Sequence, residues 1–333
     1  MQFSLTPDLL FNTRLARQNS TLRARLETVG QEAVTGRRSD VVAATNGRVG
    51  DAFLLDQAAA QIKRQQGATN LARARLESAS VSISQIRETL ISFTPEARVT
   101  LETGQDSSLE LMSETASDAL SVVTGSLSRR QGSRHLFSGT ATAGAPFAPT
   151  QDIQAAVDAI VAAGPDTATA LAAIDDYFNV PGGGFDTNIY RGSAAEGPRL
   201  HISNDQSFDP IPKGDDPLLK DVMRGFAIVV GARNAATDAE RDAMISAGLD
   251  LLDTATEGML SLESRFGANL QGLDRIDESL RSEASLISST QNTLLGRDMF
   301  DAAAELQALE GQLEASYTVT GRLGGLSLVN FLR

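Results

Sequence analysis

The sequence predicts a mainly α-helical protein: a long antiparallel coiled-coil helical bundle built from both chain ends, with a small mixed α/β domain inserted between them. Three observations predict this fold. Eight of the ten prolines fall between Pro146 and Pro217, together with the GGG run at 182–184. Because proline interrupts helices, long helices are confined to the two flanks of that window. Apolar residues then recur every seven positions in each flank, as they do in packed helices.

The N-terminal flank carries six heptads. Their first positions are Leu55, Ile62, Thr69, Leu76, Ile83 and Leu90, and their fourth positions are Ala58, Gln65, Ala72, Ala79, Ile86 and Phe93. We expect this helix to end at Pro95, since proline lacks the N–H that a helix interior needs. A shorter helix should follow, with one apolar face formed by Leu109, Met112, Ala116, Leu120, Val123 and Leu127.

The C-terminal flank repeats more strictly. Large apolar residues stand at eight consecutive heptad positions, namely Ile245, Leu252, Met259, Phe266, Leu273, Leu280, Ile287 and Leu294. Gly258, Gly267 and Gly272 interrupt this helix, and each costs about 1 kcal/mol relative to alanine in a helix. A helix of this composition is poorly stable alone, so we expect packing against partner helices to hold it.

The inserted region should contain helices near 151–163 and 168–178, short strands at 189–190 and 200–203, and a helix over 217–232 that returns to the bundle. A mainly β insert is the alternative. We therefore expect three parts: paired terminal helices at 1–35 and 299–333 as an inner assembly domain, a coiled-coil core at 36–139 and 218–298, and an exposed insert at 140–217.

The two ends carry apolar stripes that we expect to form an assembly interface. Its candidate residues are Leu5, Leu9, Asn12, Asn19, Leu22, Leu26 and Val29 at one end, with Leu313, Tyr317, Leu323, Leu328 and Phe331 at the other. Residues 1–50 have a net charge of +3 and residues 299–333 a net charge of −2, so the two helices suit each other and similar neighbours. The alternative is that these stripes pack only against each other within one chain, as an intramolecular bundle. Asn12 and Asn19 either lie within the apolar stripe, where they would set the register of the paired helices, or lie at the edge of the stripe.

Composition excludes several classes of protein. The chain of 333 residues contains no cysteine, which excludes a disulfide scaffold, a cysteine-based zinc or iron–sulfur site and a thiol nucleophile. Its net charge is −13. The acidic balance argues against nucleic-acid binding. No apolar run approaches the roughly 20 residues of a membrane span, and the first twenty residues lack the pattern of a signal peptide. We expect no nucleic-acid or membrane partner.

No pattern of residues indicates catalysis. His135 and His201 lie in different regions without other ligands at metal-binding spacing. The GGG run lacks the context of a phosphate or dinucleotide loop. The acidic pairs at 175–176 and 215–216 fit solvated faces better than an acid–base couple. We therefore expect no enzyme activity, no catalytic residue, no metal and no cofactor.

Four segments, in order, resemble the flagellin superfamily. VTGRRSD (34–40) is similar to its Ser/Thr-Gly-Lys/Arg turn, although the Asp-Asp-Pro that often follows is absent. SRHLFSGTATAGAPF (133–147) resembles the segment by which the chain leaves the core helices, and SRFGANLQGLD (264–274) a stretch of the long C-terminal helix. The closing LSLVNFLR (326–333) resembles the tail of the members that join hook to filament. The insert matches no segment of the family.

The resemblance implies a structural component of the bacterial flagellum, exported by the flagellar type III apparatus without a cleaved signal peptide and extracellular in its final place. Its implied partners are further copies of itself in a ring, the hook-side junction protein and flagellin. An export chaperone that caps the apolar C-terminal helix is a further hypothesis. A flagellin filament subunit is the nearer alternative, and a cytoplasmic coiled-coil adaptor is the alternative from another class. An enzyme hidden in the insert is the most distant.

Overall fold

The computed structural model describes residues 6–195, 200–203, 206–208 and 211–331, with side chains described outside 1–12, 196–210 and 323–333. Within these ranges the chain is mainly helical. It divides into two compact units, one formed by residues 1–64 with 279–333 and the other by 65–278. The expected division into an assembly domain, a core and an exposed insert is based on proposed roles in assembly and has other boundaries. It stays a prediction.

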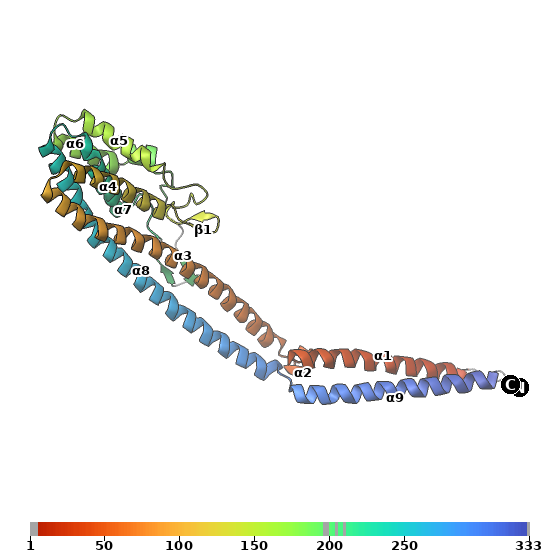
Figure 1. Cartoon of the computed structure of the whole chain (residues 1–333). Helices are drawn as coiled ribbons and strands as arrows, with labels where there is room; N and C mark the ends of the chain where they lie inside the picture. Colours follow the sequence, from red (N-terminus) through yellow and green to blue (C-terminus); the bar gives the residue numbers. More distant parts are fainter. Residues whose placement is uncertain (1–5, 196–199, 204–205, 209–210, 332–333) are drawn as a thin grey trace. The chain divides into compact units, whose positions relative to one another are not determined.

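In its described residues, the unit that contains both chain ends is built from three whole helices and from the ends of two long ones. α1 (Thr6–Thr35) is followed by the short α2 (Val41–Ala44) and by the first residues of α3 (Val49–Thr103). The last part of α8 (Asp238–Leu295) leads into α9 (Met299–Phe331). α1 and α9 contact each other along their length (Figure 1). The first and last helices of the chain therefore form one pair.

The other unit contains the remainder of α3 and α8 and everything between them. α4 (Asp106–Leu127) is followed by the hairpin β1 (Arg130–Gln131) and β2 (Arg134–His135). Then come α5 (Thr150–Ala163), α6 (Thr167–Asn179), the π-helical turn η1 (Phe185–Ile189) and the antiparallel pair β3 (Leu200–Ser203) and β4 (Gln206–Phe208). α7 (Pro217–Gly231) and η2 (Ala232–Asn234) return the chain to α8.

The heptad positions form the core of this unit. Ile83, Ile86 and Leu90 of α3 are fully buried, as are Leu252 and Met259 of α8. The rings of Phe93 on α3 and Phe226 on α7 lie 5.2 Å apart between centroids. All six expected apolar residues of α4 are buried. The periodicity of the sequence therefore correctly predicted which face of each helix packs inward.

Ion pairs fix the antiparallel register of α3 and α8. Arg73 contacts Asp274, Arg87 Nε lies 2.7 Å from Glu263 Oε2, and Arg98 Nη2 lies 2.7 Å from Asp250 Oδ1. As the residue number rises along α3, the partner's number falls along α8 by a similar amount. Arg98 also contacts Asp253, one turn further along α8.

The inserted region shares this core. α5 and α6 both contact α7. Ile153 and Val157 of α5 and Ile174 and Phe178 of α6 are fully buried in the same apolar cluster as α3, α4 and α8. The described part of 140–217 contains two helices and one hairpin, which fits the mixed α/β expectation and not the mainly β alternative. The insert is therefore an extension of the helical core.

Close approach of α7 and α8 depends on glycine. A Cβ on Gly225 would lie 2.6 Å from Leu252 Cδ2, and a Cβ on Gly248 would lie 3.0 Å from the carbonyl oxygen of Gly225. A Cβ on Gly258 would lie 2.4 Å from Leu218 Cδ1. Here the contact between helices offsets the cost of glycine within a helix.

Two expectations about boundaries are wrong. α3 does not end at Pro95 but continues to Thr103 with that proline inside it. Pro95 is exposed while Phe93 and Ala97 are buried, so burial on both sides holds the helix through the missing hydrogen bond. Ile189–Tyr190 is not a strand: Ile189 ends the π-helical turn η1, and Tyr190 makes a single β-bridge with Phe147.

Candidate functional site: the paired terminal helices

The seam between α1 and α9 is apolar but incompletely covered. Val29 and Leu309 are buried, at 3% and 4% exposure. Leu22 and Leu26 of α1 and Leu313 of α9 are only half-buried. A fully buried leucine contributes about 1.5–3 kcal/mol, so each of these three leaves roughly 1 kcal/mol of burial unrealised. Two helices cannot enclose these side chains, and an additional partner would complete the burial.

One polar pair lies in the seam. Ser316 Oγ donates a hydrogen bond to Asn19 Oδ1 at 2.5 Å, and both residues are half-buried. The bond aligns the two antiparallel helices at this level. A buried asparagine in a coiled coil fixes register at some cost in stability. The geometry fits the seam interpretation of Asn19 better than the edge alternative.

Two contacts bracket the seam on its opposite flanks. Arg23 Nε donates to Tyr317 Oη at 2.5 Å, and the Arg23 guanidinium carbon lies 5.3 Å from the centre of that ring. Arg25 Nη2 donates to Glu305 Oε1 at 2.8 Å. In an antiparallel coiled coil the e positions of the two helices meet on one side and the g positions on the other. Arg23 and Tyr317 occupy e positions on one side of the seam, and Arg25 and Glu305 occupy g positions on the other side.

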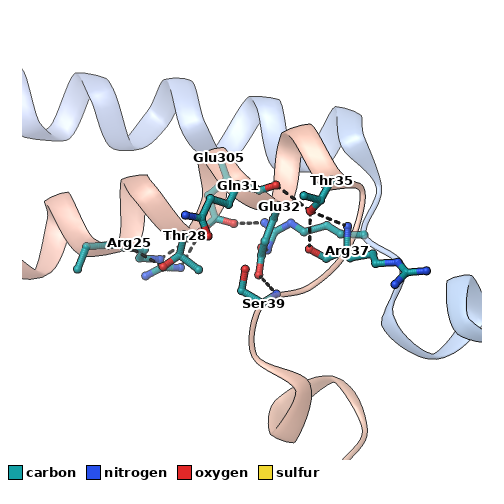
Figure 2. A network of polar contacts seen from close by, with 10 residues as sticks. Arg25, Thr28, Gln31, Glu32, Thr35, Arg37, Ser39 and Glu305 are labelled. Carbon is teal, nitrogen blue, oxygen red and sulfur yellow. Dashed lines mark hydrogen bonds and ion pairs between the residues drawn. The ribbon is translucent and has the colours of Figure 1, made fainter. Parts of the chain in front are cut away.

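A buried carboxylate lies where α1 ends and α9 begins; the turns at 36–40 and 296–298, which meet there, are called the elbow. Glu32 is 5% exposed; its Oε1 accepts from the backbone N–H of Ser39 at 2.8 Å, and its Oε2 accepts from Arg297 Nη1 at 2.5 Å. Arg297 also pairs with Glu305, which in turn holds Arg25. Figure 2 shows Glu32, Ser39, Glu305 and Arg25 in this network. Four charged groups thus tie α1 to α9 and to both connecting turns.

Backbone hydrogen bonds join the two turns directly. Arg38 N–H donates to the carbonyl of Leu295 at 2.8 Å, and Arg297 N–H donates to the carbonyl of Gly36 at 3.0 Å. Gly36 has a φ of +66°, a left-handed conformation that other residues adopt only with strain. The two chain segments that cross the elbow are therefore bound to each other as well as to the helices.

The adjoining ends of α3 and α8 extend the network. Gln291 is buried; its Oε1 accepts from Arg37 Nη2 at 3.0 Å and its Nε2 donates to Asp56 Oδ1 at 2.8 Å. One amide therefore connects the turn after α1, the start of α3 and the end of α8.

The network shifts the pKa values of two of its members. Hydrogen bonds from Arg297 and from Arg25 lower the pKa of Glu305, since both stabilise its ionised form. The pKa of Arg297 is raised, with the hydrogen bond to Glu305 as the largest cause. Both shifts favour the charged pair at neutral pH.

The described residues place part of the expected interface in this pair. Asn19, Leu22, Leu26, Val29 and Leu313 face the seam, and Tyr317 is 40% exposed beside it. Leu9 and Asn12 belong to α1, and Leu323, Leu328 and Phe331 to α9, but their side chains lie outside the described part, and Leu5 lies outside it altogether. That these residues contact other subunits stays a proposal.

The sequence did not single out Glu32, Arg297 or Glu305. The glycine of VTGRRSD and the GRD stretch at 296–298 mark the two turns, yet nothing in either indicates that they pair. Large exposed apolar residues near the elbow were also missed. Phe53, Val34 and Phe300 are 60%, 85% and 83% exposed, and a helix-periodicity argument had assigned none of them a role.

The other candidate groups have ordinary structural contacts. His135 is buried, and its Nδ1 donates to the carbonyl of Ser128 at 2.8 Å. Asp175 pairs with Arg224, and Lys213 Nζ lies 3.0 Å from Asp215 Oδ2. His201 lies outside the described side chains. Among the residues with described side chains, no three histidine, aspartate or glutamate residues gather to hold a metal ion. No helix in the described ranges has both the length and the hydropathy of a membrane span.

No protein-family model matches the sequence, and no curated protein matches it either. The fold does match solved structures. FlgL of Bacillus cereus aligns with a TM-score of 0.53 at 11% identity, over 72% of this chain and 98% of that one. A structure described as a flagellar hook-associated protein of Vibrio parahaemolyticus aligns with a TM-score of 0.53 at 13% identity, over 74% and 96%. This chain therefore shares its fold with both of these solved structures.

Proposed function

We propose that the chain is a structural component of the bacterial flagellum, an adaptor at the junction between hook and filament that assembles through its terminal helices. The observation that carries the proposal is the pairing of the first and last helices around a seam that two helices cannot cover. The shared fold with FlgL and with a hook-associated protein supports the same assignment.

Physically, the helix pair is suited to polymerisation. Its half-buried leucines gain burial only when a neighbouring subunit covers them, so assembly supplies stability that the monomer lacks. Helices that order further on binding couple their folding to assembly. The proposed role makes and breaks no covalent bond; it matches one helical lattice to another.

The proposed partners follow from this role. Further copies of the chain form a ring, the hook-side junction protein lies on one side and flagellin on the other. The proposed location is extracellular, reached by type III export without a cleaved leader. The resemblance of the tail at 326–333 and of the segment at 133–147 favours a junction protein over a flagellin filament subunit.

Deletion of the gene, followed by electron microscopy of the cells and assay of flagellin in the medium, tests the proposal. A junction protein predicts hooks without filaments and flagellin lost to the medium. Hooks without filaments and without any flagellin would indicate that the chain is the filament subunit. Normal filaments in a strain with a single gene copy would contradict both and favour a cytoplasmic coiled-coil adaptor.

An export chaperone is proposed separately, from the apolar stripe of α9. A pull-down from cytoplasm compares the full chain with a chain that lacks residues 299–333. Loss of a partner from the truncated chain supports the chaperone, and equal recovery of all partners contradicts it.

A further inference from the structure

The α1–α9 pair has two flanks that can be told apart by their contacts. The contact between Arg23 and Tyr317 marks one flank, and the ion pair between Arg25 and Glu305 marks the other. Residues three, four or seven positions from these markers lie on the same side of their helix. The charges on each flank can therefore be assigned from the described contacts and the heptad register.

The flank marked by Arg23 and Tyr317 is acidic. Glu27 follows Arg23 by four residues, while Glu310 and Glu314 precede Tyr317 by seven and three. All three glutamates are exposed, and none has an ion pair with another residue whose side chain is described. The Arg23 guanidinium contacts the neutral tyrosine and keeps its positive charge, so these three glutamates and Arg23 together carry a net charge of −2. Three carboxylates on this flank thus have no ion-pair partner among the described side chains.

The opposite flank is basic near the outer end of the pair. Arg14 and Arg322 occupy outward positions on the side of Arg25 and Glu305, and Arg17 points directly away from the seam by the heptad register. All three are exposed and have no ion pair within the described side chains. Asp301, a carboxylate on the same flank, lies about 30 Å nearer the elbow by helical rise.

The hydrogen bond between Asn19 and Ser316 shows which levels of the two helices coincide. By that alignment Arg14 lies level with Arg322, whereas Glu310 and Glu314 lie level with residues 21–25 of α1. The centres of the basic and acidic groups are therefore about ten residues apart along the pair, or about 15 Å at 1.5 Å per residue.

We propose that a second copy of this chain docks its basic flank, formed by Arg14 and Arg322 with Arg17 on the adjoining outward face, against the acidic flank of Glu27, Glu310 and Glu314, displaced by about 15 Å along the helices. The inference rests on the proposed function, in which copies assemble through this pair. Contact between two different flanks is heterologous and can continue from copy to copy. The axial displacement makes the ring of copies a helical staircase, in which each copy lies one step further along the axis than its neighbour. Burial of the half-covered leucines supplies affinity, and the charges select the register.

The cysteine-free chain allows a direct test by disulfide cross-linking. Gln18 lies on the basic flank, and Gln307 lies on the acidic flank at the displaced level. Ser20 also lies on the acidic flank, but at nearly the same level along the helix pair as Gln18. All three residues are exposed. Gln18→Cys protein is mixed with Gln307→Cys protein or with Ser20→Cys protein, assembled, and oxidised mildly. Sedimentation verifies assembly, and circular dichroism verifies that each variant is folded.

The staircase predicts about fivefold more Gln18→Cys/Gln307→Cys heterodimer than Gln18→Cys/Ser20→Cys heterodimer, with a preference that weakens in high salt, since exposed ion pairs are individually weak and screened. Charge reversal at Arg14→Glu and Arg17→Glu in the first protein should remove the preference, and Glu310→Arg with Glu314→Arg in the second should restore it. Assembly with equal or reversed yields overturns the displaced register and leaves the proposed function standing. Failure of the unmodified chain to assemble overturns both.

Discussion

Arg297 Nη1 donates to Glu32 Oε2 at 2.5 Å, across 265 residues of sequence, and this pair joins the two ends of the chain at the elbow. Glu32 is buried on α1, whereas Arg297 comes from the turn before α9. Because the same arginine also holds Glu305, loss of Glu32 leaves a partly buried guanidinium with one carboxylate instead of two. The stability of the elbow therefore depends on the side chain of Glu32.

We expect Glu32→Gln to destabilise the helix pair by about 2 kcal/mol, because a partly buried ion pair is broken while one hydrogen bond to Ser39 is retained. Amide hydrogen exchange over residues 26–40 should accelerate by roughly thirtyfold under conditions in which exchange reports local opening. Glu27→Gln, on the same helix but exposed, is the matched control and should leave exchange unchanged. Equal effects of the two variants would show that the elbow pair contributes nothing.

The helix pair should lose stability in acid. Arg297 and Arg25 lower the pKa of Glu305 below the ordinary glutamate value of about 4.3, so its contribution is present above that value and is lost as pH falls through the lower, folded-state pKa. Protection of α1 and α9 from hydrogen exchange, corrected for intrinsic rates, should be flat from pH 8 to 5 and fall below about pH 4. Glu305→Gln should reduce this fall, and an unchanged profile in that variant would contradict the assignment.

Glycines on α8 should respond to alanine in opposite directions. Gly248→Ala should destabilise the protein by about 1–3 kcal/mol, because its Cβ would lie 2.9 Å from Val229 Cγ2 and 3.0 Å from the carbonyl of Gly225. Gly267→Ala should stabilise it by up to about 1 kcal/mol, since nothing lies within 4 Å of that Cβ. Urea unfolding followed by circular dichroism measures both. A stabilising Gly248→Ala would contradict the packing between α7 and α8.

Trypsin should cleave the monomer first near its ends. Arg14, Arg17 and Arg322 are exposed on helices whose seam is half-covered, whereas Arg87 lies in the helical core and is paired with Glu263. Cleavage at the three terminal sites should slow at least tenfold on assembly while the rate at Arg87 stays low throughout. A monomer that resists trypsin at the three terminal sites would show that ordering of the ends does not depend on assembly.

The sequence predicted the helical core because burial on a helix follows a short period. Ile245, Leu252, Met259, Phe266, Leu273 and Leu280 are all buried, as their spacing required. Ile287 and Leu294 lie beyond Leu280, toward the end of α8, and are only half-buried because fewer helices pack around that part of the chain. The period reports which face is apolar, and the number of neighbouring helices decides how completely that face is covered.

The elbow network could not be predicted from the same pattern. Glu32, Arg297 and Glu305 meet only because two turns cross at one level, and no local rule relates residues so far apart. The expectation that α3 ends at Pro95 is wrong because the rule for proline describes isolated helices, whereas packing of Phe93 and Ala97 stabilises this one. The strand expected at 189–190 is absent because Ile189 instead ends the π-helical turn η1, in which Ile189 and Phe185 are both buried.

The position of the chain in purified flagella tests the central claim most directly. Immunogold electron microscopy with an antibody against this chain should label one narrow band per flagellum, between hook and filament. Label along the whole filament would instead identify a filament subunit. Absence of label from flagella of cells that express the protein would contradict a flagellar role altogether.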